Sequence, residues 1–328
     1  MSFKDVIGQD AAVRILQDEL ATGRVNHAYL FLGKEGVGKK TLAFQFTKSL
    51  NCQESRLDSC EGCLACRKIN HANHPDVKLL TIEDGNTIKI EQIRELQRDL
   101  AYKPYESSRK VYIIDRADRM TPEAANSLLK TLEDPPEYAV IILLAEELNK
   151  LLPTVISRCQ QIHLNTLTRE EIKERLLESG IEEEQANLIS RLADGSLGRA
   201  LELSEDAEFM DTRSSILELL ISLPEINTIE LFNQVDRLVS LIEKGFPLFD
   251  LILSWYRDII IYNQGNCEQL VNYDYLERMK SQQDIYTIED LVAIITLINN
   301  TKGYIDLNVK KDLALQVMLF KIRAKRCK

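Results

Sequence analysis

A glycine-rich loop between a predicted strand and a predicted helix constrains this chain more than any other feature. The apolar run at residues 28–32 stops at the loop GKEGVGK, residues 33–39, and Leu42, Phe46 and Leu50 follow at helical spacing. Such a loop suits phosphate groups, because its glycines let backbone N–H groups surround them, the helix N-terminus adds positive potential and the lysine reaches the outer phosphates. The sequence therefore predicts a phosphate site rather than a plain strand-to-helix turn. Its binding residues would be Gly33, Gly36, Gly38 and Lys39.

The position after the loop lysine departs from what Mg²⁺ binding needs. A Ser or Thr hydroxyl normally holds the metal there, whereas this chain has Lys40, with Thr41 one residue later. One residue along a helix turns a side chain by about 100°, at 3.6 residues per turn, so Thr41 cannot simply take the place of the missing hydroxyl. Lys40 also brings a positive charge to the metal position.

A second nucleotide element departs from the usual pattern as well. The apolar strand at 111–114 ends at Asp115, which could orient Mg²⁺ through water. The next position carries a glutamate that polarises the attacking water in ATPases of this kind, and here it is Arg116, a cation that cannot act as a base. The sequence predicts that ATP or ADP can bind while hydrolysis is absent or very slow. Compensation by a nearby residue is the alternative.

Four cysteines cluster after the helix that follows the loop. Cys52, Cys60, Cys63 and Cys66 form the pattern C-x7-C-x2-C-x2-C. The N-terminus shows no secretory pattern, so the cluster favours a metal over disulfides. Four thiolates at these spacings suit a tetrahedral, structural Zn²⁺ with no open position. An iron–sulfur cluster or four free thiols are the alternatives.

The order of elements predicts the fold class. Up to about residue 165, apolar strands alternate with helices, which is typical of a mostly parallel sheet covered on both faces. After that the strands stop and only helical patterns follow. We expect an α/β nucleotide-binding domain at 1–165 with a zinc insert at 52–66, a small helical lid at 166–208 and an all-helical collar at 209–328.

Charge and hydropathy exclude several classes of protein. The formal net charge is −10, whereas a dedicated DNA-binding domain is usually basic, so contact with DNA would come through a local patch or a larger assembly. No apolar run approaches the ~20 residues of a membrane helix. We expect a cytoplasmic protein without a membrane partner.

Four strings occur in order along the chain: VIGQ at 6–9, NSLLKTLEDPP at 126–136, LPTVISRC at 152–159 and GSLGRAL at 195–201. Together they resemble the AAA+ clamp-loader subunits of bacterial DNA polymerase III, and the cysteine insert is similar to the zinc module of those subunits. The resemblance implies an AAA+ P-loop domain followed by a lid and by a collar that holds subunits in a ring.

The resemblance also implies roles for single residues. Val6 and Ile7 would flank the adenine, and Arg199 would face the chain's own nucleotide from the lid, although a structural role for Arg199 is equally open. Arg158 of the SRC string would reach a neighbouring subunit's ATP as an arginine finger, because guanidinium is planar, permanently charged and suited to phosphate. An internal salt bridge is the plainer interpretation of Arg158.

Within this family, motor subunits of the gamma/tau type keep the metal-binding threonine and the catalytic acid. The departures at Lys40 and Arg116 favour the non-hydrolysing delta-prime type, with no activity expected of the chain alone. Implied partners are the gamma/tau and delta subunits, the sliding clamp and primed DNA. An ATP-hydrolysing gamma/tau-type motor and a stand-alone P-loop enzyme such as a small-molecule kinase are the alternatives.

Phosphate contacts with DNA are a weaker prediction. Candidate cations follow one another along a predicted helix and the loop after it, and acidic residues on the same helix favour i,i+4 pairing on a solvated face instead. The cations are Arg94, Arg98, Lys103, Arg109 and Lys110.

Overall fold

The computed structural model describes residues 2–55, 57–83 and 85–325. The chain divides into two compact units, the first comprising Met1–Ala186 with Ala193–Glu202 and the second comprising Asn187–Leu192 with Leu203–Lys328. The segment 166–208 contributes to both units, and the three-domain division stays a prediction.

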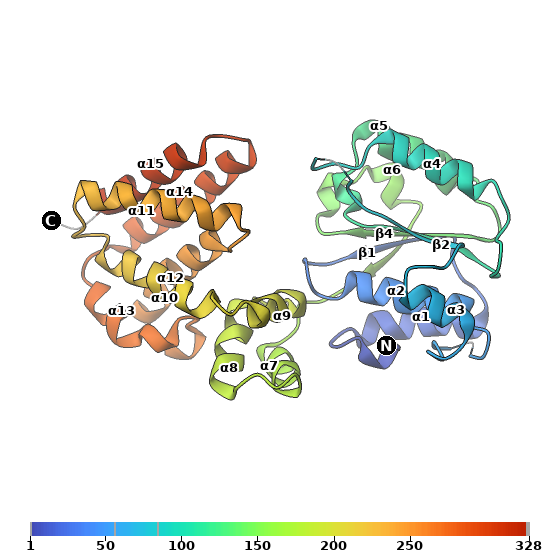
Figure 1. The fold of residues 1–328 in the computed structure, drawn as a ribbon, viewed down its shortest axis with the longest axis horizontal. Helices are drawn as coiled ribbons and strands as arrows, with labels where there is room; N and C mark the ends of the chain where they lie inside the picture. Colours follow the sequence, from blue (N-terminus) through green and yellow to red (C-terminus); the bar gives the residue numbers. More distant parts are fainter. Residues whose placement is uncertain (1, 56, 84, 326–328) are drawn as a thin grey trace. The chain divides into compact units, whose positions relative to one another are not determined.

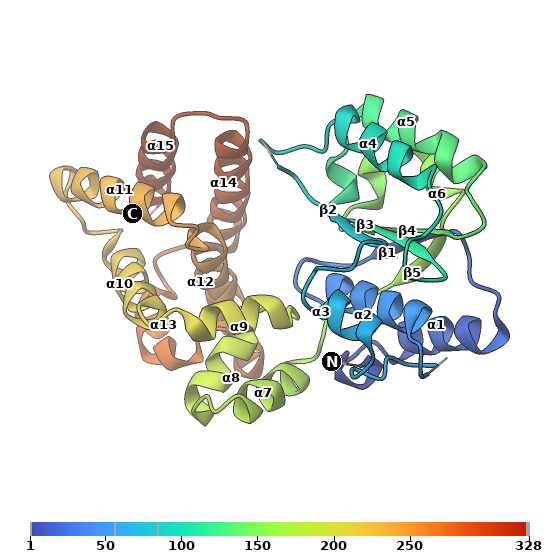
Figure 2. The same ribbon diagram turned by 45° about the vertical axis from the view of Figure 1, so that its right-hand side comes forward.

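The first unit is built on a five-stranded sheet in the order β2-β3-β4-β1-β5, with every pair of neighbours parallel. This confirms the predicted α/β class and the parallel sheet. Figures 1 and 2 show α1, α2 and α3 on one face of the sheet and α4, α5 and α6 on the other. The strands are β1 (Ala28–Leu32), β2 (Val77–Leu80), β3 (Lys110–Ile114), β4 (Ala139–Ala145) and β5 (Gln160–His163). The helices are α1 (Asp10–Thr22), α2 (Lys39–Asn51), α3 (Leu64–Asn70), α4 (Ile90–Leu100), α5 (Pro122–Glu133) and α6 (Pro153–Ile156), with 3-10 turns η1 (Phe3–Asp5), η2 (Ala117–Arg119) and η3 (Leu148–Lys150).

Burial follows the position of each strand in the sheet. The three central strands, β3, β4 and β1, are buried along their whole length, as a sheet covered on both faces requires. The edge strands β2 and β5 are partly exposed. Because all five strands are parallel, their carboxyl ends share one edge of the sheet, and this edge carries the loop after β1 and the residues after β3 and β4.

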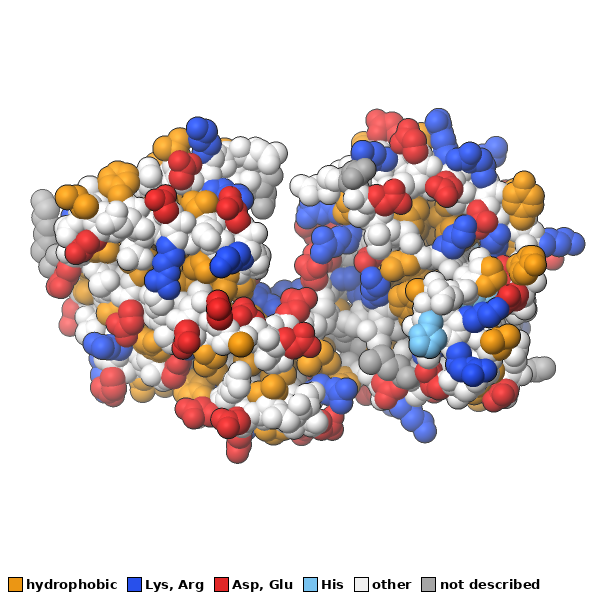
Figure 3. All heavy atoms as spheres, in the orientation of Figure 1, with side chains coloured by type: hydrophobic (Ala, Val, Ile, Leu, Met, Phe, Trp, Pro, Cys, Tyr) orange, Lys and Arg blue, Asp and Glu red, His pale blue; other side chains and the backbone are white. Residues whose placement is uncertain are grey.

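The helices after the sheet belong partly to each unit. Three of them follow the last strand: α7 (Arg169–Glu178), α8 (Glu183–Leu192) and α9 (Leu197–Glu205). The remaining elements are α10 (Phe209–Ser222), α11 (Thr228–Glu243), α12 (Leu248–Asn263), η4 (Cys267–Gln269), η5 (Tyr273–Tyr275), α13 (Leu276–Gln282), α14 (Ile288–Asp306) and α15 (Lys311–Ala324). In the described chain, no helix combines the length and the apolar character needed to span a bilayer. Figure 3 shows basic and acidic side chains interspersed over the visible face, in line with the acidic net charge.

A buried polar network holds the second unit together. The Arg213 guanidinium of α10 is 1% exposed and binds both carboxylate oxygens of Asp274, at 2.7 and 2.8 Å. Its Nη2 also donates to Asn272 Oδ1 at 2.8 Å. Asp258 of α12, fully buried, accepts hydrogen bonds from the backbone N–H groups of Val271 and Asn272. The network therefore fixes the irregular segment between α12 and α13 against two helices.

We expect Arg213→Ala to destabilise the second unit by about 1–3 kcal/mol, because the buried Asn272 oxygen and the partly exposed Asp274 carboxylate lose their hydrogen-bond donor. Urea unfolding followed by Trp255 fluorescence measures this unit, since Trp255 is buried in α12 and is the chain's single tryptophan. The exposed Arg237→Ala serves as control, with a change within about 0.5 kcal/mol. Equal midpoints for the two variants would contradict the role given to the network.

Candidate functional site

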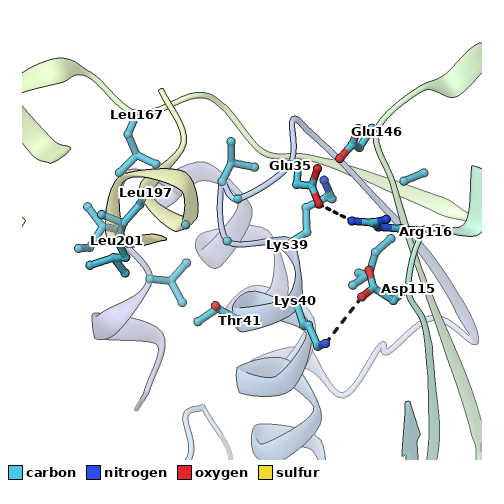
Figure 4. Close-up of a pocket in the computed structure, with 18 of the residues that line it drawn as sticks. Glu35, Lys39, Lys40, Thr41, Asp115, Arg116, Glu146, Leu167, Leu197 and Leu201 are labelled. Carbon is cyan, nitrogen blue, oxygen red and sulfur yellow. Dashed lines mark hydrogen bonds and ion pairs between the residues drawn. The ribbon is translucent and has the colours of Figure 1, made fainter. Parts of the chain in front are cut away.

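A pocket of about 470 Å³ lies at the carboxyl edge of the sheet. Its wall combines the loop after β1, the residues after β3 and β4, the segment after η1 and the start of α9 (Figure 4). Most of the residues predicted to bind nucleotide line it: Val6, Ile7, Gly36, Gly38, Lys39, Lys40, Thr41 and Asp115. Gly33 and Arg199 are not among the described lining residues, and Glu202 lines the pocket from the helix that carries Arg199.

The loop lysine is held in place by the loop itself. Lys39 Nζ donates to the carbonyl oxygens of Gly33 at 2.5 Å and Lys34 at 2.9 Å. Burial lowers the pKa of Lys39, while carboxylates around the pocket act in the opposite direction. The ammonium is thus positioned at the mouth of the loop before any ligand arrives.

Gly36 at the tip of the loop meets the turn before α9. The N–H of Gly198 donates to the Gly36 carbonyl at 2.9 Å. A Cβ on Gly36 would lie 2.0 Å from Ser196 Oγ, and its φ of +75° also favours glycine. The loop therefore packs backbone to backbone against the turn before α9, and only glycine at position 36 leaves room for this contact.

The metal position is occupied by a side-chain cation. Lys40 Nζ lies 3.7 Å from Asp115 Oδ2, and Figure 4 shows Thr41 on another side of α2, pointing away from Asp115. Mg²⁺ demands near-octahedral oxygen ligands at about 2.0–2.1 Å. An ammonium group beside the one carboxylate that would orient the metal does not fit that requirement. The residues here do not suit Mg²⁺.

The position of the catalytic acid is likewise taken by an ion pair. Arg116 Nη2 lies 2.5 Å from Glu35 Oε1 of the loop. The nearby Glu35 carboxylate raises the pKa of Arg116 further. Arg116 also adopts a left-handed backbone, with φ of 54°. The side chain at position 116 is therefore a cation that cannot accept a proton from an attacking water.

Sequence reasoning missed two acidic residues at the phosphate end. Glu146 directly follows β4, and Asp118 lies in η2; both line the pocket. Burial raises the pKa of Glu146, and the carboxylates of Glu35 and Asp118 act in the same direction against Lys39. The signal that could have found Glu146 is its place directly after a buried strand, at the edge where parallel strands present their ligands.

The other end of the pocket is apolar. Leu167, Leu197 and Leu201 face it in Figure 4, and Val6 and Ile7 complete this wall. The N-terminal segment is fixed there by Gln9: its Nε2 donates to the Asn165 carbonyl at 2.8 Å, and the Asn165 N–H donates to its Oε1 at 2.9 Å. The pocket thus has one apolar and one charged end.

Arg158 lies at the amino ends of the parallel strands, whereas this pocket lies at their carboxyl ends. It follows α6 and stands two residues before β5, whereas the phosphate loop follows the carboxyl end of the parallel neighbour β1. The four residues of β5 span ~13 Å at ~3.3 Å per residue. The guanidinium is one-third exposed, with Nη2 donating to Glu133 Oε1 at 2.6 Å and Nη1 to the Thr154 carbonyl at 2.8 Å.

The four predicted zinc ligands come together. One ligand atom from each of Cys52, Cys60, Cys63 and Cys66 lies within 4.8 Å of all the others. Although burial would raise it, hydrogen bonds from the N–H groups of Gln53 and Cys66 lower the pKa of Cys63 to about 7, whereas burial raises the pKa of Cys66. This donor set fits Zn²⁺, whose ligands must be thiolates. The cysteines would supply a closed, structural shell.

Two contacts join the cysteine loop to the nucleotide pocket. Lys48 of α2, with 1% of its side chain exposed, pairs with Glu61, which also accepts hydrogen bonds from Ser59 at 2.6 Å and from Asn70 at 2.9 Å. Although burial acts the other way, these hydrogen bonds lower the pKa of Glu61 to about 2. Asp58 Oδ1 accepts the N–H of Phe3 at 3.1 Å, just before the segment that lines the pocket.

Comparison with known proteins agrees with this geometry. Residues 8–168 match the family described as DNA polymerase III, delta subunit, and residues 207–324 match its C-terminal family. The delta' subunit of DNA polymerase III from Bacillus subtilis is 33% identical over 304 residues, covering 92% of each chain. The chain belongs to the DNA polymerase III delta-subunit family.

More distant relatives are similar over less of their length. The tau subunit from Escherichia coli is 38% identical over 213 residues, which cover 63% of this chain and 33% of that subunit. A solved gamma subunit-related protein from Thermotoga maritima aligns with 20% identity and a TM-score of 0.43, over 96% of this chain and 99% of that one. Membership in the family therefore rests on the near full-length match.

The predicted DNA cations differ in their surroundings. Lys110 is buried and ion-paired with Asp99 at 3.0 Å, so it serves the fold. Arg109 donates to the Glu137 carbonyl, and Arg98 Nε donates to the Arg94 carbonyl at 3.4 Å. Lys103 is exposed. Contact of these residues with DNA stays a prediction.

We expect about one zinc per purified chain, lost on Cys63→Ser, because three sulfurs cannot complete the closed shell. Metal analysis by mass spectrometry measures it, and the variant should also melt at a lower temperature. Cys267→Ser, an exposed cysteine outside the cluster, is the control and should keep its zinc. Iron, or no metal, in the wild-type chain would refute the zinc assignment.

Proposed function

We propose that this chain is a non-hydrolysing subunit of the delta-prime type in a bacterial DNA polymerase III clamp loader. It assists loading of the sliding clamp on primed DNA and offers Arg158 to the ATP of a neighbouring subunit of the gamma/tau type. Family membership and the near full-length similarity to a delta' subunit support the assignment.

The observation that carries the proposal is the separation of Arg158 from the chain's own pocket. Parallel strands put the phosphate loop and Arg158 at opposite edges of the sheet. Arg158 therefore cannot serve the nucleotide of its own chain, whereas a guanidinium on an exposed edge can reach a site on another subunit.

The contacts of Arg158 suit such a role. Its partner Glu133 ends α5 and is half-exposed, and exposed ion pairs contribute only about 0–1 kcal/mol. Moving the guanidinium from Glu133 to a phosphate therefore costs little. The Thr154 carbonyl holds the other side of the group and keeps it near the start of β5.

Loss of hydrolysis in this chain follows from the two ion pairs of the pocket. The Lys40 ammonium lies at the metal position and Arg116 pairs with Glu35, so neither metal ligation nor water activation is provided. In the assembly, the subunit would contribute a constant shape and the arginine finger, and it would not hydrolyse ATP itself. These points count against the alternative of a gamma/tau-type motor.

The second unit offers a surface for assembly. Apolar side chains four residues apart on α14 and on α15 are more than half exposed, as are two at the end of α14 and just after it. They are Ile288, Val292, Tyr304, Leu307, Leu313 and Val317. Of these, Tyr304, Leu307 and Leu313 lie near one another along the chain, around the turn from α14 to α15, and we assign this apolar segment to contact with neighbouring subunits.

Contact with the clamp and with DNA would come from exposed side chains of the assembled loader. The net charge of −10 leaves DNA contact to local cations within a larger assembly. Arg94, Arg98 and Lys103 are the candidates for phosphate contacts, which give affinity without reading the base sequence.

We expect Arg158→Ala to lower the DNA-stimulated ATPase rate of a reconstituted clamp loader by at least about tenfold, because a finger supplied in trans is worth ~10³–10⁵ at its own site. Arg158→Lys should restore little, since Lys lacks the planar fork. Arg175→Ala removes a similar exposed ion pair on α7 and should leave the rate unchanged. Co-purification with the other subunits verifies assembly, and an assembled Arg158→Ala loader with the wild-type rate would rule out the finger.

A further inference from the structure

The charges at the phosphate end of the pocket identify the ligand that it accepts. Six carboxylates and three cations line the pocket among the described residues. Two of the cations, Lys40 and Arg116, are paired with Asp115 and Glu35. A ligand therefore meets Lys39 at the N-terminus of α2 and, beside it, the Lys40 ammonium next to Asp115.

We propose that this pocket binds a nucleoside diphosphate without a divalent cation, with the Lys40 ammonium in the place of the metal and an acidic wall excluding a third phosphate. The inference names the ligand of the pocket and does not depend on the finger assigned to Arg158.

The first step concerns the metal. In a P-loop site, Mg²⁺ neutralises the outer phosphates from a position between the hydroxyl after the lysine and the acidic residue after the strand. Here Lys40 Nζ lies 3.7 Å from Asp115 Oδ2 and supplies a positive charge at that place. A bound metal would face this ammonium directly, whereas a phosphate can accept hydrogen bonds from it. The ammonium therefore substitutes for the metal toward a diphosphate.

The second step concerns the number of phosphates. The outermost phosphate is the one that the loop lysine reaches, and Lys39 here lies among the carboxylates of Glu35, Asp118 and Glu146. Asp118 is 9% exposed, and its Oδ1 is a buried oxygen without a hydrogen-bond partner in the described structure. A third phosphate would bring further negative charge to this unscreened carboxylate and to Glu146. Like charges at close range in a partly buried site disfavour that ligand.

The third step concerns the rest of the ligand. The opposite end of the pocket is lined by Val6, Ile7, Leu167, Leu197 and Leu201, an apolar wall that suits a flat base. The volume of about 470 Å³ lies within the range of small-ligand pockets. The apolar end of the pocket therefore suits a nucleotide base, whereas the carboxylates at the other end limit the number of phosphates.

Titration calorimetry of the full-length chain with ADP and with ATP, in EDTA and in excess Mg²⁺, tests the inference. We expect the ADP dissociation constants in the two buffers to agree within about threefold, and ATP to bind about tenfold or more weakly than ADP in EDTA. Lack of ADP binding in EDTA, a tenfold gain from Mg²⁺, or ATP binding as tightly as ADP would each overturn it.

Single substitutions separate the two steps. Lys40→Thr restores the metal-binding hydroxyl and removes the ammonium, so ADP binding should weaken about tenfold in EDTA and recover in Mg²⁺. Glu146→Gln should bring the affinities for ATP and ADP within about threefold of each other. The exposed Lys244→Thr is the control and should match the wild type.

Failure of this inference is distinguishable from failure of the proposed function. Binding is measured on the isolated chain, whereas the Arg158 experiment measures ATP turnover by neighbours in the assembled loader. If Lys40→Thr does not fold by circular dichroism, the wild-type comparison of EDTA with Mg²⁺ still decides the question. A Lys40→Thr chain that folds and binds ADP with the metal-independent wild-type affinity counts against the substitution of metal by ammonium.

Discussion

The parallel register of β1 with β4 and β5 is the constraint on which the rest of the first unit depends. Leu30 pairs with Leu143 on one side and with Gln161 on the other, so the three strands run level across the sheet. Residues that follow these strands therefore lie at the carboxyl ends of the strands, and residues that precede them lie at the amino ends. The pocket and Arg158 are separated for that reason, without any special contact to hold them apart. In the proposed function, the chain can therefore offer Arg158 to a neighbouring subunit at the amino ends of the strands and hold its own ligand at their carboxyl ends.

The two ion pairs of the pocket change its chemistry without changing its shape. Lys40 with Asp115 and Arg116 with Glu35 join the loop and α2 to the residues after β3, across the gap that a bound metal and an attacking water would otherwise occupy. All four side chains are partly exposed, so each pair contributes little to folding. Their effect is on ligand choice, because they set the charge that the phosphates meet.

Local patterns were sufficient for the continuous apolar elements. The strand at 28–32 has the predicted bounds, and the strand predicted at 111–114 begins one residue earlier, at Lys110, since burial on both faces leaves a clear apolar run. Strand β5 was missed because its sequence, QQIH, has no apolar run, and its pairing with β1 gives it its conformation. The string at 195–201 was identified by resemblance alone; in the structure α9 begins inside it, at Leu197 after Ser196, whose Oγ accepts the Arg199 N–H at 3.1 Å.

The site was predictable where a motif carries it and not where the fold assembles it. The loop at 33–39, Asp115 and the four cysteines have characteristic spacings, so the sequence was enough to group them. Glu146 and Asp118 carry no motif; they reach the pocket because β4 lies between β3 and β1 in the sheet. The pairing of Arg116 with Glu35 has the same origin. Strand order is a non-local property, and it decided these contacts.

The role of the cysteine loop lies in its contacts with α2 and with the N-terminal segment, rather than in catalysis. Glu61 has a left-handed backbone and yet anchors Lys48 in the middle of the buried part of α2, the helix that begins at the phosphate loop. Asp58 holds the N–H of Phe3 at the start of the segment that supplies Val6 and Ile7. A closed shell of four sulfurs would fix both contacts at once, because Asp58 and Glu61 lie between Cys52 and Cys63. The metal would thus stabilise the attachment of the cysteine loop to α2 and to η1, the two segments that lead into the pocket.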